Sequence, residues 1–232
     1  MSRIQRKLLQ KRRKRIRIIK YIATASTIIT GLLVCIVLVY SHDVFRLTQE
    51  QKELKDFNQH YFYLNPDYAG WLQVSGTDID FPVVRGNDNS EYLHTNFLGE
   101  ENILGAIFMD YRCNRESRHT IIYGHDAQDY DGNRLMFGTL RSYLDNGFWA
   151  AHPVIAFATE DEVKEYRIFS VRASDINDAA YHLDFNSDED FKDFAQTVNA
   201  PEGTDDILTL STCLGTKEDK RLIIQAAYVQ NQ

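Results

Sequence analysis

Short apolar runs separated by turn residues dominate the chain from Trp71 onward. Runs of about 4–8 residues rich in β-branched and aromatic side chains, bounded by Gly, Asp and Asn, are typical of β-strands. Several of these runs are apolar almost throughout, which favours a closed barrel over an open sheet with one solvated face. We therefore predict a mainly β fold with helices, an eight-stranded barrel. Its strands are expected in WLQVSG (71–76), DFPVVRG (80–86), ILGAIFMD (103–110), HTIIYGHD (119–126), PVIAFAT (153–159), EYRIFSVRAS (165–174), DILTLSTC (206–213) and RLIIQAAYV (221–229).

Three other segments have the spacing of helices. Residues 43–63 carry apolar side chains at helical intervals, with polar residues on the other face, and LNPDYAG ends the segment. Residues 134–146 and 187–200 read as helical insertions, and the second begins with an acidic turn behind Ser187, a good helix start. We expect an N-terminal helix and a helical insertion before the strand that ends at Cys213. The apolar positions of the first segment are Val44, Leu47, Leu54, Phe57 and Tyr61.

The N-terminal part of the chain follows a different pattern. Residues 21–40 contain no charge and, at ~1.5 Å per residue in a helix, would reach ~30 Å, about one hydrocarbon thickness. Residues 1–20 hold ten Lys and Arg and no acid, whereas residues 21–232 hold 16 basic and 33 acidic residues. A single-pass protein is predicted, with its N-terminus in the cytoplasm and residue 41 onward outside.

The sequence SHDVFRL after the apolar stretch is a poor cleavage site, so this stretch does not read as a signal peptide. The basic run alone would also suit nucleic-acid binding, but its position against an apolar 20-mer and the acidity of the remainder argue against a nucleic-acid partner. We expect four parts: a basic cytoplasmic tail (1–20), a transmembrane anchor (21–40), a juxtamembrane helical segment (41–70) and a catalytic barrel domain (71–232).

A strand that becomes polar as it ends carries the candidate chemistry. Alternation in ILTLSTC places Thr209, Ser211 and Cys213 on one face. A short hydrophilic connection over 214–220 then returns the chain so that Arg221 opens the next strand near the thiol. A thiol needs a neighbouring cation or a base to attack, and arginine, always charged, can stabilise a thiolate or an oxyanion but cannot act as the base. His125, which directly follows the apolar run TIIYG, is the candidate proton partner.

A disulfide is the alternative for the same cysteine. Cys35 falls within the apolar span, which leaves Cys113 and Cys213 as a possible bridge in an oxidising compartment. Cys113 lies in the charged sequence DYRCNRESRH, where we expect it to be exposed. No Cys/His metal spacing occurs, and the acidic stretch at 126–134 lacks the full calcium-loop pattern and reads as a solvated turn. We expect no metal and no cofactor.

Together these residues resemble the sortases, the membrane-anchored cysteine transpeptidases of Gram-positive surfaces. The chain carries YGH first, then TLSTC, and then an arginine that opens the following strand, which gives the order His, Cys, Arg. The segments GTDIDFPVVRGNDNSEYLHTNF, GAIFMDYR, TIIYGHD and MFGTL are most similar to class B. The resemblance implies a sortase-type eight-stranded barrel with Cys213 as nucleophile, His125 as acid and base, and Arg221 as an oxyanion or substrate clamp. It also implies substrate-binding roles for Asn89, Leu93, Tyr123, Tyr181 and Ser211.

The resemblance implies partners as well. A sortase would cleave a C-terminal sorting signal of secreted proteins through a thioacyl-enzyme, and it would transfer them to an amine of a peptidoglycan cross-bridge or of a pilin lysine. Two other hypotheses stay open at this point. One is a non-catalytic extracytoplasmic binding domain with a Cys113–Cys213 disulfide, and the other keeps the catalytic residues but uses water as the acceptor.

Overall fold

The computed structural model describes residues 21, 24, 28–35, 52–214 and 220–228. It divides into two units, residues 1–53 and 54–232. In the first unit, residues 28–35 are helical and exposed. None of the helices in the described part of the chain is both long and apolar enough to span a bilayer. The predicted basic tail and half of the predicted span lie outside the described residues, so the anchor stays a prediction.

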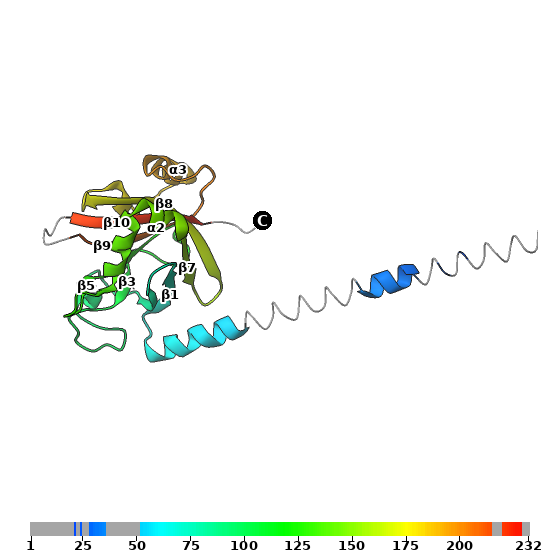
Figure 1. Ribbon diagram of the computed structural model, residues 1–232, viewed down its shortest axis with the longest axis horizontal. Coiled ribbons are helices and arrows are strands. Elements are labelled where there is room, and N and C mark those ends of the chain that lie inside the picture. Colours follow the sequence, from blue (N-terminus) through cyan, green and yellow to red (C-terminus); the bar gives the residue numbers. More distant parts are fainter. Residues whose placement is uncertain (1–20, 22–23, 25–27, 36–51, 215–219, 229–232) are drawn as a thin grey trace, which may run out of the picture. The chain divides into compact units, whose positions relative to one another are not determined.

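The second unit is built around a closed barrel of eight strands, as predicted (Figure 1). Around the barrel the order is β1-β2-β3-β4-β9-β10-β8-β7. The pairs β2–β3 and β4–β9 are parallel, and the other neighbours are antiparallel. Each predicted run supplies one barrel strand. The strands are β1 (Tyr68–Val74), β2 (Asp80–Val84), β3 (Ile107–Met109), β4 (His119–Tyr123), β7 (Val154–Ala158), β8 (Val163–Asp175), β9 (Ile207–Cys213) and β10 (Lys220–Tyr228).

Strand β9 shows why some runs are apolar on both faces. Leu208 and Leu210 point into the barrel and join the main core cluster. Ile207 points outward and is covered by Phe191 and Phe194 of α3 (Asp188–Thr197), the helix that lies over this side of the barrel in Figure 1. Because both faces are covered, the first six residues of β9 are all buried. The strand can therefore hold polar side chains on its outer face only where other polar groups meet them.

The helical insertion before β9 is confirmed. Helix α3 begins behind Ser187, whose side chain accepts a hydrogen bond from the backbone N–H of Asp190 at 3.1 Å. At the start of the second unit, residues 54–64 belong to a helix whose described part begins at residue 52, and the predicted positions 43–51 lie outside the described residues. Phe57 and Tyr61 of that helix pack on Trp71 of β1, with ring centroids 5.2 and 4.6 Å apart. The short 3₁₀ helices η1 (Glu91–Leu93) and η3 (Ala179–Tyr181) interrupt the connections β2–β3 and β8–β9.

The predicted helix over 134–146 is wrong in its first part. Its start forms β6 (Arg134–Met136), which pairs with β5 (Asp126–Gln128) in a separate two-stranded sheet. Asp129 shapes the intervening turn, because its carboxylate accepts the backbone N–H groups of Asp131 and Asn133 at 2.9 and 2.8 Å. Met136 then adopts a φ of 48°, a left-handed conformation that a helix cannot include. The remainder is the 3₁₀ helix η2 (Phe137–Leu144) followed by α2 (Asn146–Ala151).

Candidate active site

Three neighbouring strands bring the predicted catalytic residues to one edge of the barrel. Strand β4 runs parallel to β9, with Tyr123 beside Ser211, so both strands end at the same edge. Strand β10 is antiparallel to β9 and starts there, with Arg221 directly opposite Cys213. Adjacent strands lie about 4.8 Å apart. Cys213 therefore occupies the middle strand, flanked by the arginine on one side and by the end of β4 on the other.

His125 follows β4 in a tight backbone arrangement. The N–H of Gly124 donates to the carbonyl of Ser211 at 3.3 Å, which ties this turn to β9. A side chain at position 124 would lie 2.8 Å from the ring of Phe137, so only glycine lets the turn pack this closely. The Nε2 atom of His125 lies 2.8 Å from the carbonyl oxygen of Leu93. Since a carbonyl only accepts, Nε2 carries the proton of this bond, and Nδ1 is left for proton exchange.

One groove contains every residue predicted for the site. It has a volume of about 400 Å³ and lies at the edge where β4 and β9 end. Cys213 is exposed, so its thiol is accessible to a substrate. The groove is lined by the predicted Asn89, Leu93, Tyr123, His125, Tyr181, Ser211, Cys213 and Arg221, and also by Phe108, Arg112, Gly124, Ile176 and Thr212.

A buried carboxylate, Asp110, organises one wall of this groove and was not predicted. Asp110 is fully buried and accepts hydrogen bonds from the side chains of Asn89 and Tyr123, both at 3.0 Å, and from Arg112 at 2.9 Å. Burial alone would raise the pKa of Asp110, but these hydrogen bonds lower it below its usual value. Burial, together with the charge of Asp110, raises the pKa of Tyr123. Asp110 therefore stays charged and Tyr123 neutral, and three groove residues are held by one group.

On the opposite wall, Tyr181 of η3 meets β9. Its hydroxyl lies 2.8 Å from the hydroxyl of Ser211, two residues before Cys213. Burial raises the pKa of Tyr181, while the hydrogen bond with Ser211 and the charge of Arg221 act against that rise. Tyr181 is therefore a neutral hydrogen-bonding group close to the thiol and the guanidinium.

Cys113 and Cys213 are both free, and Cys113 lies where it was not expected. Cys113 is buried at 1% exposure, not exposed, because the loop after β3 turns inward and its Sγ contacts the carbonyl oxygen of His119 at 3.5 Å. Burial raises the pKa of Cys113 to about 11. Cys213 is exposed in the groove, and no disulfide joins the two. The structure thus does not contain the bridge on which the binding-domain hypothesis rested.

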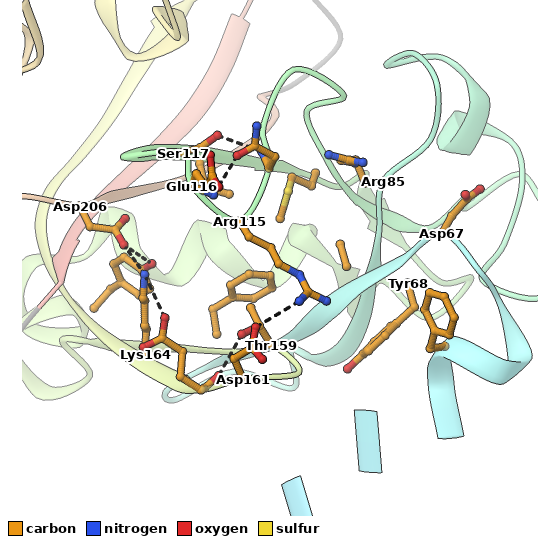
Figure 2. A pocket seen from close by; sticks show the side chains of 18 of the residues that line it. Asp67, Tyr68, Arg85, Arg115, Glu116, Ser117, Thr159, Asp161, Lys164 and Asp206 are labelled. Atoms are coloured by element: carbon orange, nitrogen blue, oxygen red, sulfur yellow. Dashed lines mark hydrogen bonds and ion pairs between the residues drawn. The ribbon is translucent and has the colours of Figure 1, made fainter. Parts of the chain in front are cut away.

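A larger cavity, of about 630 Å³, is lined by charged side chains and contains none of the predicted site residues (Figure 2). Its charges largely satisfy one another. Lys164 binds Asp206 at 2.8 Å, and Arg115 binds Asp161 at 3.1 Å. The larger cavity is therefore not the candidate active site. The smaller groove is, because it contains the accessible thiol of Cys213.

His119, buried at the start of β4, is expected to make stability depend on pH. Burial lowers the pKa of His119 from 6.5 to about 4. Between these two pH values the unfolded histidine binds a proton that the folded one does not, so the free energy of unfolding should rise with pH across this window. The contribution is about 3 kcal/mol, at about 1.4 kcal/mol for each pKa unit.

Urea unfolding at pH 7 and pH 4.5 tests this expectation in the native chain and in a His119→Gln variant, whose amide does not titrate. The loss of stability on acidification should be smaller in the variant by roughly 2–3 kcal/mol. Equal losses in both proteins would show that His119 does not cause the dependence. The remaining titratable groups are common to both chains, so their contributions cancel in the comparison.

A closed eight-stranded barrel with a cysteine, a histidine and an arginine in one groove at its edge defines a class, the cysteine enzymes built on a β-barrel. A family model described as "Sortase domain" matches residues 72–229, most of the chain. The chain belongs to the sortase family, and it is a cysteine transpeptidase of that family.

Relatives and solved structures agree on class B. Sortase B of Listeria monocytogenes is 35% identical over 204 residues, which are 82% of this chain and 81% of that protein. Sortase B of Staphylococcus aureus is 31% identical over 180 residues, 72% of each. A cysteine-to-serine mutant form of Clostridium perfringens sortase B has a TM-score of 0.70 at 28% identity, covering 79% of this chain and 91% of that one. A Staphylococcus aureus sortase B–substrate complex has a TM-score of 0.65 at 28% identity, covering 81% and 94%.

Proposed function

We propose that this sortase cleaves a C-terminal sorting signal with Cys213 as the nucleophile and transfers the acyl part to an amine. The observation that carries the proposal is the pairing of Cys213 with Arg221 across β9 and β10, in the groove that also holds His125. Asn89, Leu93, Tyr123, Tyr181 and Ser211 would bind the signal peptide, since all five line the same groove. The solved complex of a class B relative with a substrate supports this reading.

In the first step, the thiol proton of Cys213 passes to Nδ1 of His125, and the resulting thiolate attacks the carbonyl carbon of the Thr–X peptide bond. A C–S bond forms, and the carbonyl oxygen becomes an oxyanion that the guanidinium of Arg221 stabilises. When this intermediate collapses, the C–N bond breaks and His125 protonates the departing amine. The thioester on Cys213 then keeps the N-terminal part of the substrate.

In the second step, an amine attacks the thioester and His125 takes the proton that the amine loses. The C–S bond breaks, a new amide forms and the thiolate of Cys213 is regenerated, so the cycle consumes no redox equivalent. The bond between His125 and the Leu93 carbonyl supports this role, because it orients the ring and leaves Nδ1 to exchange the proton.

We also propose where the enzyme works. The basic residues 1–20 and the uncharged residues 21–40 support a single-pass anchor with a cytoplasmic N-terminus and an extracytoplasmic barrel. The acceptor is then an amine available outside the cell, either of a peptidoglycan cross-bridge or of a pilin lysine. Water as the acceptor would make the same site a hydrolase.

Intact-protein mass spectrometry tests the proposal directly. The full chain is incubated with a panel of peptides that carry NPxTN-like or LPxTG-like signals. The adduct on Cys213 should have the mass of the peptide N-terminal to the scissile bond. Addition of a cross-bridge peptide or a lysine peptide should release the adduct as a ligated product. Peptide cleavage with no thioester on Cys213 would refute the mechanism, and release only as free acid would identify a hydrolase.

A further inference from the structure

Buried polar side chains form a closed hydrogen-bonded ring beneath the turn that carries Tyr181. The ring begins at His119, whose Nδ1 lies 2.8 Å from the carbonyl oxygen of His182. A carbonyl only accepts, so Nδ1 carries the proton. The other nitrogen of the neutral imidazole, Nε2, therefore accepts from the hydroxyl of Thr209, at 2.8 Å. These two bonds join β4 to β9 and to the chain after η3.

From Thr209 the ring continues across β10 and β8, and each hydrogen bond has a defined donor and acceptor. The hydroxyl oxygen of Thr209 accepts from Nε2 of Gln225 on β10 at 3.3 Å. The Oε1 atom of Gln225 accepts from Arg172 on β8 at 2.8 Å. Arg172 also donates to the carboxylate of Asp178, at 3.0 and 2.5 Å. Asp178 then accepts the backbone N–H of Ala180 at 2.9 Å.

Both ends of this path therefore hold the same turn, residues 178–182. One end binds it at Asp178 and Ala180, and the other binds it at the carbonyl of His182. The path crosses the adjacent strands β4, β9, β10 and β8. Its central members, His119, Thr209 and Gln225, are at most 1% exposed. Because water cannot replace a lost partner in such a site, removal of one hydroxyl should leave two buried polar groups unpaired.

The turn held by this ring carries a side chain of the groove. Tyr181 lies between the two ends of the ring, and its hydroxyl contacts Ser211. Thr209, Ser211 and Cys213 occupy the same face of β9, so the ring lies next to the groove, further along the strand. Thr209 itself does not line the groove. Its effect on a substrate must therefore act through the position of Tyr181.

We propose that the ring of His119, Thr209, Gln225, Arg172 and Asp178 is a positioning device that fixes Tyr181 for recognition of the substrate peptide, with Thr209 as its central positioning residue. The inference rests on the proposed function, since it assumes that the peptide occupies the groove. It assigns the ring to binding and not to the chemical step. Loss of the ring should therefore raise KM and leave kcat close to its native value.

A pair of substitutions at one position tests the device. Thr209→Val keeps the branched shape but removes the hydroxyl, whereas Thr209→Ser keeps the hydroxyl. Thr209→Val is expected to raise KM for a signal peptide by about 10-fold, the factor for one lost buried hydrogen bond, with kcat within about 2-fold. Thr209→Ser should stay within about 2-fold in both constants. Equal KM values for the native chain and Thr209→Val would overturn the proposal.

A double-mutant cycle separates positioning from general damage. In a Tyr181→Ala background, Thr209→Val should change KM by less than about 2-fold, because the side chain through which it acts is absent. Additive effects would show that Thr209 influences the groove by another route, and the positioning role would be rejected.

Amide hydrogen exchange provides a readout that does not depend on activity. The N–H groups of Tyr181 and His182 are bonded to the carbonyls of Asp178 and Ala179 at 3.1 and 3.0 Å, so their exchange reports opening of the turn. Thr209→Val should accelerate both by about 10-fold and Thr209→Ser should not. The N–H of Val74, bonded to Ile79 across the β1–β2 turn, serves as the control amide and should not change.

These outcomes distinguish the two proposals. If the native chain cleaves no peptide but Thr209→Val still loosens the turn, the ring is retained as a device that fixes Tyr181 and the proposed substrate is wrong. If peptides are cleaved but the turn exchanges equally in both variants, the ring proposal fails and the proposed function stands.

Discussion

Replacement of Cys213 with alanine is expected to reduce transpeptidation by at least about 10⁴-fold and to abolish the acyl-enzyme adduct. The thiol of Cys213 is exposed in the groove and lies opposite an arginine. In the proposed mechanism, both chemical steps pass through its sulfur. Removal of the nucleophile in covalent catalysis commonly costs several powers of ten, and what remains reflects substrate binding and oxyanion stabilisation. The measurement is kcat/KM for a signal peptide with a cross-bridge amine, together with the intact mass of the protein.

Cys113 is the matched control for this substitution. Its thiol is buried and its pKa is raised to about 11, so it should neither react with a peptide nor be alkylated at neutral pH. Cys113→Ala is expected to keep native kcat/KM, and iodoacetamide should label Cys213 first in a chain that lacks Cys35. Turnover that survives in Cys213→Ala and disappears in Cys113→Ala would reverse the assignment of the nucleophile.

Replacement of Arg221 with methionine should lower kcat/KM by about 10²–10³-fold, the usual cost of one oxyanion-stabilising group. Methionine keeps much of the length and apolar volume of the arginine side chain but carries no charge. Arg221→Lys restores a charge without the planar fork of donors and should recover activity only in part. Steady-state kinetics on the same peptide measure both effects.

The rate of alkylation of Cys213 shows whether Arg221 stabilises the oxyanion or the thiolate. Iodoacetamide forms no tetrahedral oxyanion, so its rate should stay within a few-fold of native in Arg221→Met if the guanidinium acts on the oxyanion. A fall in alkylation that parallels the fall in turnover would instead assign Arg221 to the thiolate. Lys220→Ala, at the adjacent exposed position of β10, is the charge-removal control and should behave like the native chain.

Local patterns in the sequence predicted much of the barrel and of the site, for physical reasons. The eight barrel strands could be predicted because a closed barrel with covered outer faces requires nearly continuous apolar segments. Alternation along β9 correctly grouped Ser211 with Cys213, and the short return placed Arg221 opposite the thiol. Each of these inferences depends on residues that are close together in the chain.

What the patterns missed depends on contacts between distant segments. Asp110 follows an apolar run, as Cys213 does, and that signal could have identified it as a group delivered to the groove. Its partners Asn89 and Tyr123, however, come from two other parts of the chain. The ring through His119 and Thr209 is similarly formed by four strands whose adjacency no local pattern encodes. The wrong helix at 134–136 has the same cause, since pairing with β5 overrides its helical spacing.

The parallel pairing of β4 with β9 also has a consequence for how the enzyme becomes active. His125 and Cys213 are 88 positions apart in the chain, and the strands that bring them together cannot be joined by a simple hairpin. Closing so long a loop costs conformational entropy before any contact repays it, so folds dominated by such pairings form slowly. A partly folded chain has the thiol but lacks the groove and the proposed proton partner, His125. Turnover therefore begins only when the barrel closes, and recovery of activity during refolding reports that single event.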